Sequence, residues 1–152
     1  MNVREYIRSK IGKVPFFQTI SMQIEMMDAQ GSRLRITSTE KHENLWRTIH
    51  GGVIASLVDA ACSASLIPIL MEDEMLMTAT LQVQYLAPVR SGDLVGQGRV
   101  IRRGKCLAYA EADIFNDQNK LIAKGNTSFM IMNGVKYIHT LNGVNGHDPF
   151  PD

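Results

Sequence analysis

The chain has 152 residues, of which 45 % are hydrophobic and 20 % are charged, an ordinary composition for a soluble domain. Sixteen basic and fifteen acidic side chains leave a formal net charge of +1. This balance argues against a dedicated binder of nucleic acids or membrane surfaces, and we expect neither as a partner. The length fits one domain over residues 1–152, with a core at about 15–132 and a loosely ordered tail at 133–152.

The cysteines and the N-terminus bear on the compartment. Cys62 and Cys106 lie in apolar runs, without a CxxC pair or the spacing of metal ligands, which predicts two buried thiols and no metal site. The N-terminal stretch MNVREYIRSK lacks the apolar segment of a signal peptide. No uninterrupted apolar run reaches the ~18 residues of a membrane span. Together these features predict a cytoplasmic protein.

The hydrophobic pattern predicts one long helix between two groups of strands. Residues 78–86 alternate polar and apolar side chains, and short turns join the three strands that follow, which is typical of an antiparallel meander. In chain order, the expected elements are a helix at 2–10, strands at 19–28 and 32–39, a polar stretch at 40–49, a helix from Gly51 to about Leu70, and strands at 78–86, 94–103, 106–115 and 120–132. A single long helix beside a mostly antiparallel sheet is an α+β arrangement.

The long helix carries many small side chains. They are Ala55, Ser56, Ala60, Ala61, Ser63, Ala64 and Ser65. Small side chains let a sheet approach closely on several sides, so we expect this helix to be central and wrapped by the sheet. Pro68 ends or kinks it.

One acid interrupts this apolar helix. Asp59 follows Leu57 and Val58, and no other residue at 51–70 is charged, so the helix has no polar face to which the acid would belong. An ionised carboxylate that is buried without a partner is strongly destabilising. The alternative is an ordinary position on the solvent side of an amphipathic helix. We interpret Asp59 as a functional residue.

The same helix begins with His50, Gly51 and Gly52. Two glycines let a ligand approach the backbone closely, and the free N–H groups of a first helical turn point toward it. A carbonyl oxygen that gains negative charge would be stabilised by these donors and by the positive end of the helix dipole. The stretch therefore predicts a main-chain oxyanion hole, although a flexible loop capped by His50 would have the same sequence.

The spacing of the two features predicts an oligomer. Gly51 and Asp59 are eight residues apart, which separates them by ~12 Å along a helix axis. A single reacting carbonyl group cannot touch both. If both serve one reaction, the acid must come from a second copy of the chain whose helix runs the opposite way, as in a two-fold dimer with shared sites.

Together these residues resemble a known pattern. It consists of Asn44, His50-Gly51-Gly52 after five residues and Asp59 after six more, followed by a strand that ends in YLAP and by a turn at 103–105. Over roughly residues 15–132 the chain resembles the hotdog-fold acyl-CoA thioesterases of the phenylacetic-acid-degradation (PaaI) type. The resemblance implies a hotdog fold, hydrolysis of an acyl-CoA to a free acid and CoA, and a homodimer or a homotetramer. It implies no cofactor, because CoA is part of the substrate.

The resemblance also implies roles for the residues that match. The Gly51 amide, helped by Asn44, resembles the pair that polarises the thioester carbonyl. Asp59 of the neighbouring subunit resembles the carboxylate that either activates water as a general base or attacks directly as a nucleophile. His50 resembles the histidine that holds the loop and Asn44 in place. Thr78 lies where relatives often carry a Ser or Thr hydroxyl near the acid and would orient the water, although a threonine at the start of a strand needs no function.

CoA and the acyl group would occupy two further regions. Gly52 and the turn of Arg103, Gly104 and Lys105 match the part of the family that holds CoA, where basic side chains suit phosphates. Without the resemblance, this turn would be an ordinary solvated hairpin tip. Trp46 and three methionines after the long helix are candidates for the acyl pocket, because methionine adapts to irregular apolar ligands. We expect a medium-chain or aromatic acyl group.

Two other functions fit the same fold. A hydroxyacyl-thioester dehydratase pairs the motif histidine with an acid farther along the helix, but the residue fourteen positions after His50 is Ala64. A non-catalytic acyl-CoA sensor would usually add a DNA-binding segment, for which the N-terminal part has no room. Because one fold hosts many functions, the site rather than the fold has to decide.

Overall fold

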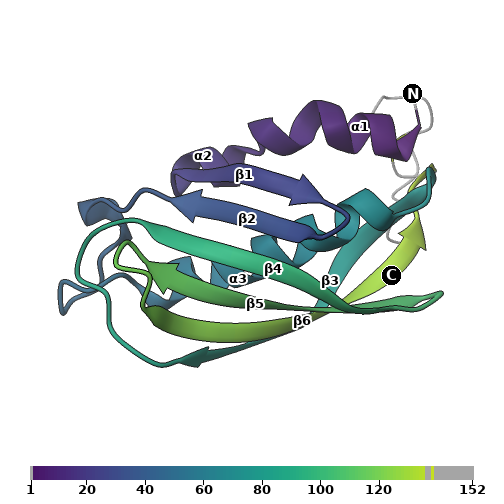
Figure 1. Ribbon diagram of the computed structural model, residues 1–152. Helices are drawn as coiled ribbons and strands as arrows, with labels where there is room; N and C mark the ends of the chain where they lie inside the picture. The colour runs from purple at the N-terminus through teal and green to yellow at the C-terminus, as the bar shows by residue number, and fades with distance from the viewer. Residues whose placement is uncertain (1, 136–137, 139–152) are drawn as a thin grey trace.

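The computed structural model describes residues 2–135 and residue 138 (Figure 1). Most of the tail expected at 133–152 therefore lies outside the described residues. The elements are α1 (Val3–Lys10), η1 (Ile11–Lys13), α2 (Pro15–Thr19), β1 (Met22–Asp28), β2 (Gly31–Ile36), η2 (Glu40–His42), α3 (Gly51–Leu66), η3 (Ile67–Ile69), β3 (Glu74–Tyr85), β4 (Leu94–Arg103), β5 (Leu107–Asn116) and β6 (Leu121–Asn133).

The six strands form one antiparallel sheet in the order β1-β2-β4-β5-β6-β3, which curves around the long helix α3 (Figure 1). This confirms the α+β prediction, the enclosed helix and the meander of the last three strands. The first strand after the helix, β3, does not join that meander in sequence order. It crosses to the far edge and pairs with β6, so β3 and β1 are the two edge strands.

Several predicted boundaries were wrong near prolines. The strand expected at 19–28 begins only at Met22, because Pro15 starts a short helix instead of merely ending the preceding one. A proline suits the first turn of a helix, where its missing N–H would have no partner. The main helix ends at Leu66, and Pro68 lies in the short 3₁₀ turn that follows. The strand expected from residue 78 begins earlier, at Glu74.

The core depends on a very close approach between α3 and the sheet. A Cβ atom added to Gly98 would lie 2.1 Å from the carbonyl oxygen of Ala61, and one added to Gly125 would lie 2.5 Å from a Val58 methyl group. The Ser32 hydroxyl donates a hydrogen bond of 2.7 Å to the same Ala61 oxygen. Small residues on both surfaces therefore bring helix backbone against strand backbone, as the composition of the helix predicted.

The stretch Gly51–Ile69 is long and apolar enough to cross a membrane by length and composition alone. Asp59 and the serines interrupt the apolar run, as the sequence analysis noted, but they do not lower its mean hydropathy below that of a spanning helix. The packing of the helix explains its apolar character without a membrane, since Leu57, Val58 and Ala61 are fully buried against the sheet.

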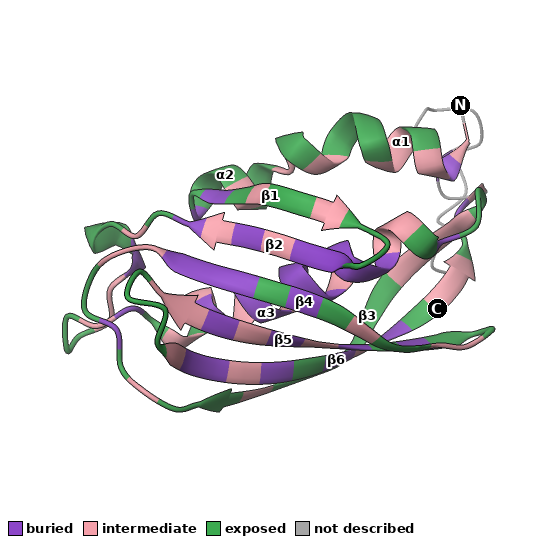
Figure 2. Cartoon of the chain, viewed as in Figure 1, coloured by how far each residue is buried: buried purple, intermediate pink, exposed green. Residues whose placement is uncertain are grey.

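Burial differs sharply between the two edges of the sheet and its middle (Figure 2). The strand β5 alternates between buried and less buried positions, as expected for a sheet with one face on the core, whereas the first three residues of β4 are all buried. Along β3, by contrast, every residue from Met77 to Gln82 is exposed. The long edge strand is thus the least covered part of the sheet.

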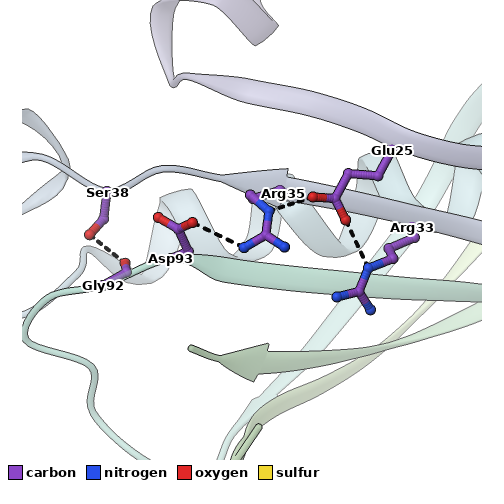
Figure 3. A network of polar contacts seen from close by, with 6 residues as sticks. All are labelled: Glu25, Arg33, Arg35, Ser38, Gly92 and Asp93. Atoms are coloured by element: carbon purple, nitrogen blue, oxygen red, sulfur yellow. Dashed lines mark hydrogen bonds and ion pairs between the residues drawn. The ribbon is translucent and has the colours of Figure 1, made fainter. Parts of the chain in front are cut away.

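A polar network fixes the chain where it leaves β2 toward the long helix (Figure 3). The Arg35 guanidinium lies between the carboxylates of Glu25 and Asp93 and is 3.0 Å from Asp93. The hydrogen bond from Arg35, aided by Arg33 and opposed by burial, holds the pKa of Glu25 below its usual value. These half-exposed pairs each add little stability, but together they join β1, β2 and the start of β4.

The close approach of α3 gives a stability prediction. Gly98→Ala should destabilise the protein by about 1–3 kcal/mol, because the methyl group has to displace helix or strand backbone. Urea unfolding followed by circular dichroism measures the change. Gly12→Ala is the matched control, since nothing lies within 4 Å of the added Cβ atom there. Equal stability of both variants would contradict the described packing.

Candidate active site

Asp59 lies on the side of α3 that faces β3. The Thr78 hydroxyl on β3 donates a hydrogen bond of 3.1 Å to one carboxylate oxygen of Asp59. Burial raises the pKa of Asp59, and the hydrogen bond from Thr78 offsets only part of this effect. No ion-pair partner of Asp59 is found in the part of the chain that the structure describes. The sequence pair Asp59 and Thr78 is therefore brought together as a partly buried acid with one hydroxyl partner among the described residues.

Asp59 does belong to a polar stripe, contrary to the expectation from the sequence. Gly52, Ala55, Ser56, Asp59 and Ser63 lie at helical spacing and are the incompletely buried positions of α3 on that side. The stripe is narrow because the sheet covers the rest of the helix. It forms a track of small and polar groups along α3, with the acid at its middle.

The helix start has the geometry that an anion site needs. His50 is the N-cap of α3, and its Nδ1 atom accepts a hydrogen bond of 2.9 Å from the Gly52 amide. The Gly51 amide is the first of the helix and has no partner within it. No other acceptor for this amide is found among the described residues. The Gly51 N–H is thus the available donor at the positive end of the helix dipole.

Tyr85 supports this glycine from the end of β3. Its hydroxyl donates a hydrogen bond of 2.9 Å to the Gly51 carbonyl oxygen, and its ring lies where a Gly51 side chain would be, 3.3 Å from the added Cβ atom. A side chain at position 51 would therefore press against the ring, which would have to shift by a few tenths of an ångström. The sequence analysis counted Tyr85 only as part of a motif and missed this contact.

Asn44 shapes the loop before the helix. Its side-chain oxygen accepts hydrogen bonds from the Trp46 and Thr48 amides at 2.8 and 3.3 Å, and its Nδ2 atom donates to the Thr48 hydroxyl at 2.9 Å. Asn44, His50 and Gly51 line one shallow hollow together with the loop tip. At this tip Leu45 is 96 % exposed and Trp46 is 83 % exposed.

A second histidine, which the sequence analysis missed, holds this loop from behind. His42 is buried, its Nδ1 atom accepts a hydrogen bond of 2.9 Å from the Thr39 amide, and its carbonyl oxygen accepts one of 2.7 Å from the His50 amide. It thereby fixes the residue that caps α3. Neither its spacing nor its surroundings in the sequence could have indicated this contact.

The turn at 103–105 is only partly available to a ligand. Arg103 forms an ion pair with Glu74 at the start of β3. Burial alone would raise the pKa of Glu74, but Arg103 and the Met71 amide outweigh it and hold the pKa below its usual value. The neighbouring Lys105 is exposed.

Both cysteines are free thiols, as expected, but only Cys62 is buried. Burial raises the pKa of the Cys62 thiol to about 12, so it is not a nucleophile near neutral pH. Cys106 is exposed because it lies in the connection between β4 and β5. Within the described part of the chain, no group of three His, Cys, Asp or Glu side chains could hold a metal ion.

Comparison with known proteins gives the family. The model of the Thioesterase superfamily matches residues 47–123, just over half of the chain. The chain belongs to this superfamily. The match includes the helix start, Asp59 and Thr78.

Two relatives of this superfamily member are informative. Acyl-coenzyme A thioesterase 13 of Mus musculus is 29 % identical over 128 residues, which cover 82 % of this chain and 90 % of the relative. The medium/long-chain acyl-CoA thioesterase YigI of Escherichia coli is 26 % identical over 133 residues, covering 78 % of this chain and 86 % of the relative.

Solved structures support the fold. A thioesterase from Haemophilus influenzae has a TM-score of 0.78 at 18 % identity, over 89 % of this chain and 94 % of that one. With the family match, this confirms the predicted hotdog fold. The finer assignment to the PaaI type stays a prediction.

The contact between Thr78 and Asp59 gives a prediction on titration. Thr78→Val should raise the pKa of Asp59 further, because the lost hydrogen bond stabilises the ionised carboxylate. Titration of the Asp59 carboxyl carbon by NMR measures this. Thr80→Val is the matched control, since the Thr80 hydroxyl pairs with Ser128. A titration curve that Thr78→Val leaves in place would refute the described contact.

Proposed function

We propose that the protein is an acyl-CoA thioesterase whose active site forms between two copies of the chain. The observation that carries the proposal is the division of the site. A free amide at Gly51 and a desolvated acid at Asp59 lie on one helix, ~12 Å apart along its axis, so neither half is complete alone. The names of the two relatives, both acyl-CoA thioesterases, support the reaction.

The edge strand β3 supports the dimer. It is twelve residues long, its exposed part carries no charge and no proline, and its outer backbone groups face no other strand of the sheet. Such an edge is ready to pair with another strand. We propose that β3 pairs with β3 of a second copy in a two-fold arrangement, which continues the sheet across both chains.

The positions of the two site halves along β3 favour a particular register. Thr78 holds Asp59 and Tyr85 holds Gly51. A bulge between Thr78 and Thr80 leaves Ala79 out of the pairing. Thr78 and Tyr85 therefore each lie three paired positions from Gln82. An antiparallel pair centred on Gln82 therefore places Thr78 of one copy opposite Tyr85 of the other. Asp59 then faces Gly51 of the second copy.

In this arrangement hydrolysis needs three groups. Asp59 takes a proton from a water whose oxygen attacks the thioester carbon, and its raised pKa makes it a better base near neutral pH. The Gly51 amide of the other copy and the dipole of its helix stabilise the oxyanion. When the intermediate collapses, the C–S bond breaks and Asp59 returns the proton to the CoA sulfur. Thr78 keeps the carboxylate oriented.

The remaining residues have positioning or binding roles in this proposal. Asn44 and His50 hold the loop and the first turn of α3, so that the Gly51 amide keeps its direction. Gly52, Gly104 and Lys105 contact the CoA part of the substrate, with Lys105 toward the phosphates. Arg103 contributes by fixing that turn through Glu74. No cofactor beyond the CoA of the substrate takes part.

The role of Asp59 gives a prediction on activity. Asp59→Asn should lower kcat roughly 10²- to 10⁴-fold on acyl-CoA substrates, the range typical of a lost general base. Release of CoA followed with a thiol reagent measures this. The variant should be at least as stable as the wild type at pH 7. The raised pKa of Asp59 means that the folded protein binds its proton more tightly, so ionisation above the usual Asp pKa costs stability.

Two outcomes would contradict the proposal. An active, folded Asp59→Asn variant would remove Asp59 from the mechanism. A wild-type protein that binds acyl-CoA in calorimetry but releases no thiol would instead favour the acyl-CoA sensor.

The register of the dimer gives a further prediction. In a Cys106→Ser background, Gln82→Cys should form a covalent dimer under mild oxidation, because paired residues in a sheet lie ~5 Å apart at Cα, within reach of a disulfide. Gln84→Cys is the control, since its two copies would lie ~14 Å apart. Non-reducing electrophoresis measures the yield. Equal yields from both variants would refute a register centred on Gln82.

A further inference from the structure

An apolar cavity of about 320 Å3 lies beside the candidate site, between α3 and the N-terminal helices. Its walls include Tyr6 and Ile7 of α1, Ser63 of α3, Ile67 of η3, and Met75 and Leu76 of β3. Nearly all of its surface is apolar. The Ser63 hydroxyl does not add a free polar group, because it donates to the Ala60 carbonyl oxygen.

The cavity continues the track along α3 that contains Asp59. Ser63 lies one helical turn beyond Asp59 on the same side, ~6 Å along the axis, and Ile67 lies one turn further. On β3, Leu76 lies two residues from Thr78 and therefore points to the same face. A group bonded to a carbonyl carbon beside Asp59 and Thr78 would thus enter the cavity directly.

The N-terminal helices form a fixed wall of the cavity. The Arg4 amide donates a hydrogen bond of 3.1 Å to the Glu72 carbonyl oxygen, and the Arg4 guanidinium donates to the carbonyl oxygen of Leu70. Val3 is buried at the same end. These contacts tie α1 to the connection between α3 and β3. The helix α1 lies outside residues 47–123, so this wall is not part of the matched superfamily region.

We infer that this cavity binds the acyl chain of the substrate, that the chain is aliphatic, and that the N-terminal helices α1 and α2 limit its length. The inference rests on the proposed function and specifies its substrate class. From Asp59 to Ile67 the track is ~12 Å long. An extended chain advances ~1.2 Å per bond, which gives room for roughly ten carbon atoms. A short, rigid aromatic acyl group would leave the far end of the apolar cavity unfilled.

The inference also assigns the two parts of the substrate to different copies of the chain. The acyl chain lies entirely within the copy that supplies Asp59. The other copy supplies the Gly51 amide, and its exposed Trp46 lies in the same hollow as Gly51. Trp46 is therefore placed to cover the thioester from across the interface.

The test compares substrates of different length on matched variants. The wild type should hydrolyse decanoyl-CoA with a kcat/KM at least a hundredfold above that for acetyl-CoA and above that for phenylacetyl-CoA. Ile67→Phe should lower the decanoyl-to-acetyl ratio of kcat/KM at least tenfold, because each methylene denied burial costs about fourfold. Ile69→Phe is the control. Ile69 lies two residues away and does not line the cavity. The decanoyl-to-acetyl ratio of kcat/KM in Ile69→Phe should therefore stay within twofold of the wild-type ratio.

A second pair of variants enlarges the cavity instead of filling it, and it decides the question if Ile67→Phe does not fold. Phe17 lines the cavity, whereas its neighbour Phe16 is exposed and does not. Phe17→Ala should shift the optimum to acyl chains that are longer than decanoyl, and Phe16→Ala should leave it unchanged. An unchanged length profile in Phe17→Ala would overturn the inference.

The outcomes separate the two proposals. If the wild type releases CoA from no acyl-CoA, the proposed function fails. If it hydrolyses acetyl-, decanoyl- and phenylacetyl-CoA equally well, or prefers phenylacetyl-CoA, the proposed function stands and the acyl-chain inference is overturned.

Discussion

The close contact between α3 and the curved sheet is the constraint on which the rest of the structure depends. At Gly98 the backbone of α3 leaves no room even for a methyl group, and at Gly125 the Val58 side chain of α3 and the Gln82 carbonyl oxygen leave none. A helix that is covered so completely keeps only one narrow stripe free of the sheet. Gly52, Asp59 and Ser63 lie on that stripe, so the packing of the core decides where an acid and a ligand can meet.

The electrostatics of Asp59 follow from the same packing. A carboxylate on an isolated amphipathic helix would be solvated. Here the strand β3 excludes much of the water around Asp59, and the Thr78 hydroxyl donates a hydrogen bond that partly replaces it. The ionised form is therefore disfavoured, and the folded protein holds the proton more tightly. Stability at neutral pH and the strength of the base are opposed at this residue, as is common at functional sites.

Much of the fold could be predicted from the sequence because its signals were local. The alternation in 78–86, the small residues of α3 and the short turns after Asp93 each specify their own element. The errors came where a local signal has two meanings, as at Pro15, which can end one helix or begin another. The position of β3 at the far edge depends on pairing with β6, whose residues lie 38 to 59 positions later in the chain, and no local pattern encodes that choice.

The candidate site was predictable to the same extent. The sequence pointed to Asp59, His50 and Gly51 because an acid and a glycine pair are unusual in such a helix. In the structure the Thr78 hydroxyl donates a hydrogen bond to Asp59. The supporting contacts of Tyr85 and His42 could not be predicted from the sequence. The Tyr85 hydroxyl, for example, reaches a carbonyl oxygen thirty-four residues away, and such a contact leaves no periodic pattern in the sequence. The commitment of Arg103 to Glu74 was hidden for the same reason.

The exposed loop tip has a practical consequence. Trp46 is the single tryptophan of the chain, and it lies in the hollow beside the amide of Gly51. Its indole emission is therefore an intrinsic reporter of that one place, free of background from any other indole. Quenching or a spectral shift would follow the filling of the hollow in real time, without a label and on the unmodified protein.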